Sequence, residues 1–150
     1  MTEKVRLGKS EVIVNPIGLG ANAVGGVNFY PNMEDKAGRG LVQSAIESGI
    51  NLIDTAKMYG PYRSEQLIGE VVKEKGCRDR VVLATKIGPK FVDGEMLMDN
   101  SVDFLRAEVD EALLRLQTDY IDLLYIHYPD ETTPKDEAVG ALRDMKVAGK

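Results

Sequence analysis

Four side chains in this sequence have the types and the spacing to form a proton-donating site. Asp54, Lys86 and His127 each end a short apolar run; Lys86 follows Asp54 by 32 residues and precedes His127 by 41. Each interval accommodates one strand–helix unit, which takes about 30 residues or more. Tyr59 lies shortly after Asp54, in the connection that follows the first run. If the runs are parallel strands, their carboxyl ends share the edge where such sheets bind ligands.

These residue types together predict proton donation to a carbonyl oxygen. A phenol, with an ordinary pKa of about 10, is a poor acid at neutral pH. A neighbouring ammonium stabilises the phenolate and lowers that pKa, while a carboxylate holds the ammonium in place. An imidazole N–H can orient a carbonyl oxygen toward the phenol. Taken singly, each residue also has an ordinary structural interpretation: a turn cap for Asp54, a solvated strand end for Lys86, loop packing for Tyr59 and a structural histidine for His127.

Short apolar runs alternate with amphipathic segments along the whole chain, and no linker or internal domain boundary divides residues 1–150. Strands are expected at 5–7, 12–14, 16–19, 51–54, 81–86 and 120–127, the first two as a hairpin. Helices are expected at 34–48 and at 64–75, the second with Ser64 as its N-cap. A third helix is expected to follow an N-cap at Asn100 or Ser101 and to run to Leu116. A fourth is expected to begin with Pro134 as its first helical residue and to stop at Gly149. A loop of about a dozen residues is expected after Lys86.

Strand and helix repeated four times predict a parallel α/β sheet. Two architectures fit: an open doubly wound sheet, or (βα)4 as the first half of a (β/α)8 TIM barrel with an N-terminal β-hairpin. A whole barrel takes about 250 residues, so length alone favours the open sheet.

The glycine-rich segment at residues 18–23 matches G-x-G-x-x-A, a dinucleotide-binding motif. That motif requires a helix to begin there, and Gly25, Gly26 and Pro31 argue against one. We therefore interpret the segment as a connection whose backbone can approach a ligand closely.

Composition excludes several classes of protein. The 150 residues include 19 Lys and Arg against 24 Asp and Glu, a net charge of −5, with 43% hydrophobic residues. The mean hydropathy of −0.20 is typical of a globular protein, and the mild acidity argues against nucleic-acid binding. No apolar run approaches 18 residues, so we expect no membrane-spanning segment. Residues 1–8 contain no apolar run of the kind found in secretion signals, so we expect a cytoplasmic protein. One cysteine, Cys77, and one histidine predict no disulfide and no metal site.

Several segments, in order and spacing, resemble the aldo-keto reductase superfamily. They are LGKS at 7–10, IGLG at 17–20, NLIDTA at 51–56, MYG at 58–60, SEQLIG at 64–69, TK at 85–86 and DYIDLLYIH at 119–127. The details look most like the bacterial inositol-operon and general-stress branch. The resemblance covers nearly the whole chain and implies a (β/α)8 barrel, of which this sequence is the first half.

The resemblance also implies an activity and its residues: NADPH-dependent reduction of aldehydes and ketones to alcohols. Tyr59 would be the proton donor, Lys86 and Asp54 the pair that makes it acidic, and His127 the residue that orients the carbonyl. The cofactor, NADPH or NADP+, would contact Gly20, Ala21, Asn22 and Asp54. The small-molecule carbonyl substrate would contact His127, with Tyr30, Phe91 and Tyr128 as apolar candidates.

The sequence departs from the family in length, because family members are about twice as long as this half of a barrel. We expect the missing half to supply most of the cofactor site, and the choice between NAD and NADP is open. The alternatives to an enzyme are a non-catalytic regulatory or binding subunit and an inert half-barrel. Two unpaired sheet edges also predict self-association of half-barrels, or a longer polypeptide.

Overall fold

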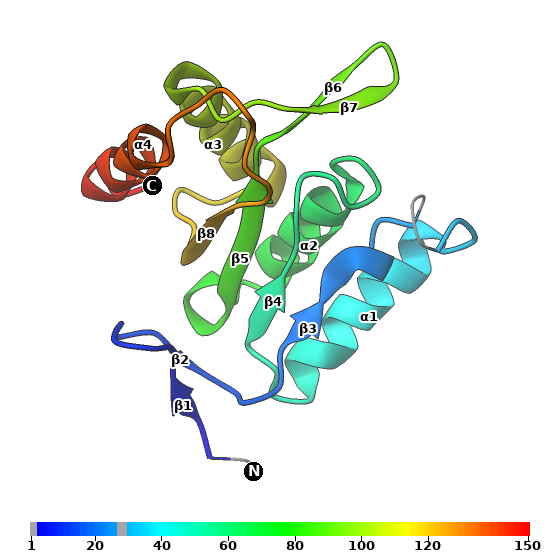
Figure 1. Cartoon of the computed structure of the whole chain (residues 1–150). Coiled ribbons are helices and arrows are strands. Elements are labelled where there is room, and N and C mark those ends of the chain that lie inside the picture. Colours follow the sequence, from blue (N-terminus) through cyan, green and yellow to red (C-terminus); the bar gives the residue numbers. More distant parts are fainter. Residues whose placement is uncertain (1–2, 27–29) are drawn as a thin grey trace.

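A four-stranded parallel sheet and four helices form the framework of the computed structural model, which describes residues 3–26 and 30–150 (Figure 1). The strands are, in spatial order, β3 (Leu19–Gly20), β4 (Leu52–Asp54), β5 (Val82–Ile87) and β8 (Leu123–Ile126). The helices are α1 (Asp35–Glu47), α2 (Arg63–Glu74), α3 (Val102–Leu116) and α4 (Lys135–Val147). Two short 3-10 helices are η1 (Ala21–Ala23) and η2 (Arg78–Arg80).

The strand order settles the choice between the two expected architectures. Within this sheet, each strand pairs in parallel with the strand that follows it in the order β3, β4, β5, β8. The sheet therefore lacks the reversal of strand order that a doubly wound sheet requires. Each helix packs on the next, from α1 to α4, and they follow the sheet in chain order (Figure 1). The chain is therefore an α/β fold of four successive βα units, consistent with the first half of a (β/α)8 barrel.

Two apolar clusters hold the helices to the sheet. The first joins β3, β4 and β5 to α1 and α2, with Ile53, Leu83 and Leu67 fully buried. The second joins the end of β5 and β8 to α3 and α4, around Leu105 and Ile87. These clusters form because apolar residues recur at helical spacing on α2 and α3 and fill the short strands. They fix the strand ends that carry the candidate site.

Two hairpins flank the framework, and one of them corrects an expectation. The N-terminal hairpin, β1 (Val5–Arg6) with β2 (Ile13–Val14), is confirmed. The expected loop after Lys86 is instead a ribbon, β6 (Pro89–Val92) with β7 (Glu95–Met98), which extends beyond the carboxyl end of β5 (Figure 1). Asp93 and Gly94 make its turn with φ of 50° and 85°. Asp-Gly is a strong hairpin signal that the sequence already carried.

Element ends differ from expectation at several points. Helix α2 begins at Arg63, so Ser64 is not its N-cap; the N-cap is Tyr62, in a left-handed conformation at φ 70°. Ser64 is buried, and its hydroxyl donates a hydrogen bond to the Ala21 carbonyl rather than to the start of the helix. Pro134 is the N-cap of α4 rather than its first helical residue, and β8 begins three residues later than expected, at Leu123. Ser101 is the N-cap of α3, without a side-chain bond to the helix.

No helix within residues 3–26 and 30–150 is long and apolar enough to cross a membrane.

Candidate active site

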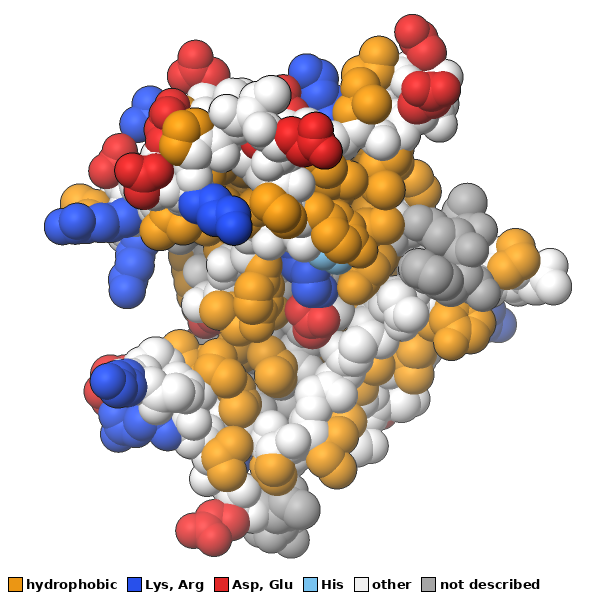
Figure 2. Space-filling model, viewed as in Figure 1, with side chains coloured by type: hydrophobic (Ala, Val, Ile, Leu, Met, Phe, Trp, Pro, Cys, Tyr) orange, Lys and Arg blue, Asp and Glu red, His pale blue; other side chains and the backbone are white. Residues whose placement is uncertain are grey.

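The carboxyl edge of the sheet brings the four predicted residues together. Asp54 is the last residue of β4, Lys86 lies near the end of β5, and His127 directly follows β8. The backbone N–H of His127 donates to the Ile87 carbonyl at 2.8 Å, which ties the end of β8 to β5. In the space-filling view, a basic, an acidic and a histidine side chain meet near the middle of this face, among hydrophobic side chains (Figure 2).

Lys86 is the centre of the group. Its ammonium donates to both Asp54 carboxylate oxygens at 2.8 Å and to the Thr55 carbonyl at 2.8 Å. The Tyr59 hydroxyl lies 3.4 Å from the same nitrogen. The Lys86 side chain is only 15% exposed, whereas that of Asp54 is 39% exposed. The ammonium is therefore held between a carboxylate and a phenol, as the proton-donor hypothesis requires.

His127 completes the group through its contact with the Tyr59 ring. The two rings meet edge to face with centroids 6.2 Å apart. Burial lowers the pKa of His127, and the positive charge of Lys86 lowers it further, so the neutral imidazole is favoured. The buried Nδ1 has no hydrogen-bond partner within the described part of the chain. We assign the single proton to Nε2, because a buried N–H without an acceptor at Nδ1 is the costlier choice.

A close approach of two backbones shapes the connection that carries Tyr59. Gly60 has a φ of 62°, and a Cβ on it would lie 2.3 Å from the Gly25 carbonyl oxygen. The Ser64 N–H donates to the Tyr59 carbonyl at 3.2 Å, and the Ser64 hydroxyl donates to the Ala21 carbonyl at 2.9 Å. The segment after β3 and the segment after β4 are thus locked together, which fixes the backbone on both sides of Tyr59.

The structure separates the predicted cofactor contacts. Gly20 is exposed, pairs in register with Asp54, and has no heavy atom within 4 Å of an added Cβ. Asn22 is partly exposed. Ala21 is fully buried and its carbonyl accepts from Ser64, so it is the least accessible of the predicted contacts, and its contact with a cofactor stays a prediction. Because Gly20 has no side chain and lies beside Asp54, a flat ligand can approach its backbone closely next to the proton-donating group.

The predicted apolar substrate contacts also differ from one another. Tyr128 stacks on the His127 ring with centroids 4.5 Å apart and is 46% exposed, so it belongs to the group. Phe91, on the β6–β7 ribbon, instead packs edge to face on Tyr62 at 5.8 Å. Tyr30 is half exposed, and within the described residues no side-chain hydrogen bond or ring contact links it to the four.

A cluster of buried charges under the site was not expected from the sequence. Lys57, Glu65 and Glu108 are buried, and Arg115 is nearly so. They form successive ion pairs between the Tyr59 connection, α2 and α3. A sequence signal exists, because Glu108 and Arg115 fall three residues after Leu105 and Ala112, on the inward stripe of α3.

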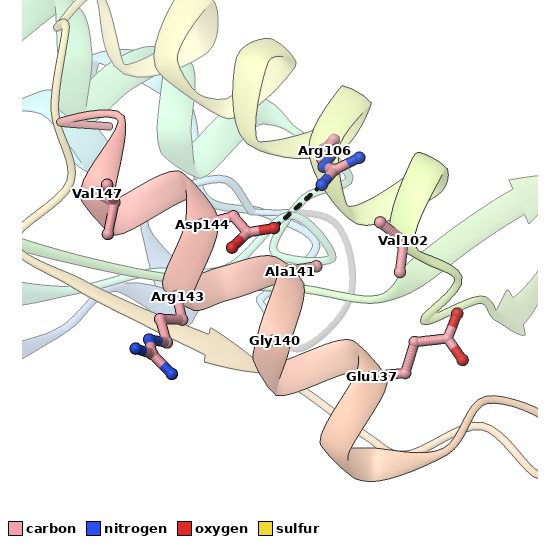
Figure 3. Close-up of a pocket in the computed structure, with 8 residues that line it drawn as sticks. All are labelled: Val102, Arg106, Glu137, Gly140, Ala141, Arg143, Asp144 and Val147. Atoms are coloured by element: carbon pink, nitrogen blue, oxygen red, sulfur yellow. Dashed lines mark hydrogen bonds and ion pairs between the residues drawn. The ribbon is translucent and has the colours of Figure 1, made fainter.

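A separate groove of about 700 Å³ lies between α3 and α4 and contains none of the four residues (Figure 3). Arg106 and Asp144 pair across it at 3.2 Å, and both are well exposed. It is a solvated cleft on the outside of two helices, and we do not treat it as the active site.

The fold is a parallel βα sheet, and the site at its carboxyl edge places the Lys86–Asp54 ion pair beside the Tyr59 hydroxyl. Comparison with known proteins identifies the class: the sequence profile of the Aldo/keto reductase family matches residues 16–150. The chain belongs to the aldo/keto reductase family, whose members are oxidoreductases.

Particular relatives agree with this assignment. The aldo-keto reductase YhdN of Bacillus subtilis (strain 168) is 38% identical over 134 residues, which cover 89% of this chain and 40% of that relative. The holo form of aldo-keto reductase AKR11C1 from Bacillus halodurans superposes with a TM-score of 0.87 and 32% identity, covering 99% of this chain and 48% of that one. The glycerol dehydrogenase AKR11B4 from Gluconobacter oxydans gives a TM-score of 0.87 and 33% identity, covering 98% and 46%. The chain spans less than half the length of these relatives.

Proposed function

We propose that this chain carries the proton-donating half of an NADP(H)-dependent reductase that converts small aldehydes and ketones to alcohols. One observation carries the proposal: a single ammonium, Lys86, contacts both Asp54 oxygens and lies 3.4 Å from the Tyr59 hydroxyl. Family membership supports the reaction class. The partner is a small-molecule carbonyl, and the place of action is the cytoplasm.

Tyr59 is the proton donor in this proposal. As a carbonyl is reduced, negative charge develops on its oxygen, and the Tyr59 O–H transfers its proton to that oxygen. The phenolate left behind is stabilised by the Lys86 ammonium. Asp54 holds the ammonium with two hydrogen bonds at 2.8 Å, so that Lys86 does not have to be ordered during the reaction.

His127 orients the substrate. A neutral imidazole with its proton on Nε2 donates to the carbonyl oxygen and leaves that oxygen free to accept from Tyr59. Because burial and Lys86 both lower the pKa of His127, the ring stays neutral at physiological pH. Tyr128 stacks on the imidazole ring and supplies an apolar wall for the substrate.

The exposed edge beside these residues fits a nicotinamide cofactor. Gly20, Asn22 and Asp54 are the residues of this chain that would hold it, because the Gly20 backbone is open to close approach and pairs in register with Asp54. When bound, the reduced nicotinamide supplies the hydride to the carbonyl carbon. The preference for NADPH over NADH rests on the resemblance of the sequence alone.

The test follows the loss of NADPH absorbance on addition of a generic aldehyde, with isothermal titration of NADPH in parallel. The proposal predicts aldehyde-dependent oxidation of NADPH. Binding without oxidation would instead support a non-catalytic binding or regulatory subunit. Neither binding nor oxidation by a folded chain would support an inert half-barrel, and light scattering then shows whether half-barrels associate.

A further inference from the structure

We propose that Lys57 is a positioning residue for Tyr59, acting through the buried charge cluster of Lys57, Glu108, Arg115 and Glu65. The inference rests on the proposed function, because it assigns a role in placing the proton donor. Lys57 lies two residues before Tyr59 in the same connection and is only 4% exposed. It does not touch the reacting groups, so it acts through the residues around it.

The cluster is a continuous series of charged contacts. The Lys57 ammonium donates to one Glu108 oxygen, and Arg115 donates to the other at 2.6 Å. Arg115 also donates to Glu65 at 2.6 Å, and the remaining Glu65 oxygen accepts from the Thr85 hydroxyl at 2.6 Å. Two cations and two carboxylates alternate, so every carboxylate oxygen of the cluster has a donor.

Both ends of the series meet the proton-donating group. At one end, the Lys57 backbone N–H donates to the Lys86 carbonyl at 3.2 Å, and the Lys57 carbonyl accepts from the Tyr62 N–H at 2.8 Å. At the other end, Thr85 is the residue before Lys86 on β5. The cluster therefore ties the Tyr59 connection to α3 through Glu108, and it ties the Lys86 strand to α3 through Glu65 of α2 and Arg115. A shift at Lys57 changes the placement of Tyr59 relative to Lys86.

The surroundings show why such charges remain inside. The Lys57 ammonium lies 4.9 Å from the centre of the Phe104 ring and 5.7 Å from the centre of the Tyr62 ring. The Arg115 guanidinium lies 5.2 Å from the centre of the same Tyr62 ring. Aromatic faces attract cations and partly replace their lost hydration. Burial raises the pKa of Glu65 against the pull of the Arg115 charge, which indicates the cost of keeping this carboxylate inside.

Stability alone is a poor account of the cluster. Buried ion pairs are commonly replaced by apolar residues of similar volume with little loss of stability, or with a gain. A cluster that only supports the fold would accept such a replacement without altering the chemistry at Tyr59. A positioning cluster would not, because misplacing a reacting group by about 1 Å costs about 10²-fold in rate.

The decisive variant is Lys57→Met, which keeps an unbranched side chain, one atom shorter, and removes the charge. The matched control is Lys75→Met, because Lys75 also pairs with a glutamate, Glu47 at 2.6 Å, but at the C-cap of α2, where both side chains reach solvent. We expect kcat to fall by about 10²-fold in Lys57→Met, with the NADPH dissociation constant unchanged and the alkaline limb of the pH–rate profile displaced. Lys57→Arg, which keeps the charge, should restore most of the rate, and Lys75→Met should match the parent.

A readout independent of turnover uses fluorotyrosine placed at position 59 and fluorine NMR of the ring. The parent and Lys75→Met should each give one sharp resonance, and Lys57→Met a shifted or exchange-broadened one. If Lys57→Met fails to fold, Glu108→Gln tests the same contact. Folded variants with the parent's resonance and pH profile would overturn the positioning role. A parent without turnover would overturn the proposed function, whereas the NMR comparison would still decide the role of Lys57.

Discussion

The Lys86 ammonium donates to both carboxylate oxygens of Asp54 at 2.8 Å, although the two residues lie 32 positions apart on neighbouring strands. Parallel pairing of β4 with β5 brings them to one edge, with Asp54 opposite Ala84, two residues before Lys86. The pair fixes the charge that faces Tyr59, and its removal is the first test of the site.

Asp54→Asn should lower kcat/KM by about 10- to 100-fold, because a hydrogen bond to a charged group contributes about 1.5–3 kcal/mol. The substitution preserves the shape of the side chain but no longer anchors the ammonium by charge. Steady-state kinetics with a generic aldehyde measures the effect. Asp93→Asn, at the tip of the β6–β7 ribbon, is the control and should retain the parent's rate. If Asp54→Asn and Asp93→Asn reduced the aldehyde at equal rates, Asp54 would have no part in the reaction.

His127 should titrate below the ordinary histidine value of 6.5, since burial and Lys86 both lower its pKa. The sequence contains one histidine, so proton NMR of its ring follows this group without ambiguity. The unfolded chain binds this proton more readily than the folded one, so the His127 contribution to stability is present above about pH 6.5 and declines as the pH falls below it. The same titration in urea should return to about 6.5. A folded-state midpoint above the urea value would show that the ring favours its charged form.

Gly60→Ala should disturb the Tyr59 connection, because a Cβ would lie 2.3 Å from the Gly25 carbonyl oxygen at a φ of 62°. We expect a loss of stability of at least about 1 kcal/mol from the left-handed backbone alone, together with reduced turnover. Urea unfolding and kinetics measure the two effects. Gly140→Ala is the matched control, since that position in α4 has open space around an added Cβ. There alanine should stabilise the helix by about 0.5–1 kcal/mol; stability of Gly60→Ala equal to the parent's would show that the backbones can separate.

Much of the fold and the core of the site could be predicted from the sequence, because the information is local. Asp54, Lys86 and His127 end apolar runs, and a parallel sheet places such ends together whatever the details of packing. The helices on either side carry their own apolar stripes. The choice between half a barrel and a doubly wound sheet was different: it depends on strand order, which no single segment encodes.

The parts that sequence reasoning missed depend on contacts between distant segments. Lys57 meets Glu108 across 51 positions, and nothing near Lys57 indicates that its side chain is buried. Ala21 occupies the middle of a glycine-rich segment that suggests an accessible backbone, yet the α2 residue Ser64 covers its carbonyl. The β6–β7 ribbon is the exception, because its turn, Asp93-Gly94, is a local hairpin signal in the sequence.

The central claim is that the Tyr59 hydroxyl, next to Lys86, delivers the proton to the substrate. The most direct measurement is aldehyde-dependent NADPH oxidation by Tyr59→Phe, which removes one oxygen atom, beside Tyr120→Phe, whose ring lies against Arg78 before the start of β8, away from the strand ends that carry the site. The account predicts that Tyr59→Phe loses about 10²–10⁴-fold in kcat, with NADPH binding intact, while Tyr120→Phe keeps the parent's rate. Turnover by Tyr59→Phe at the parent's rate would contradict it.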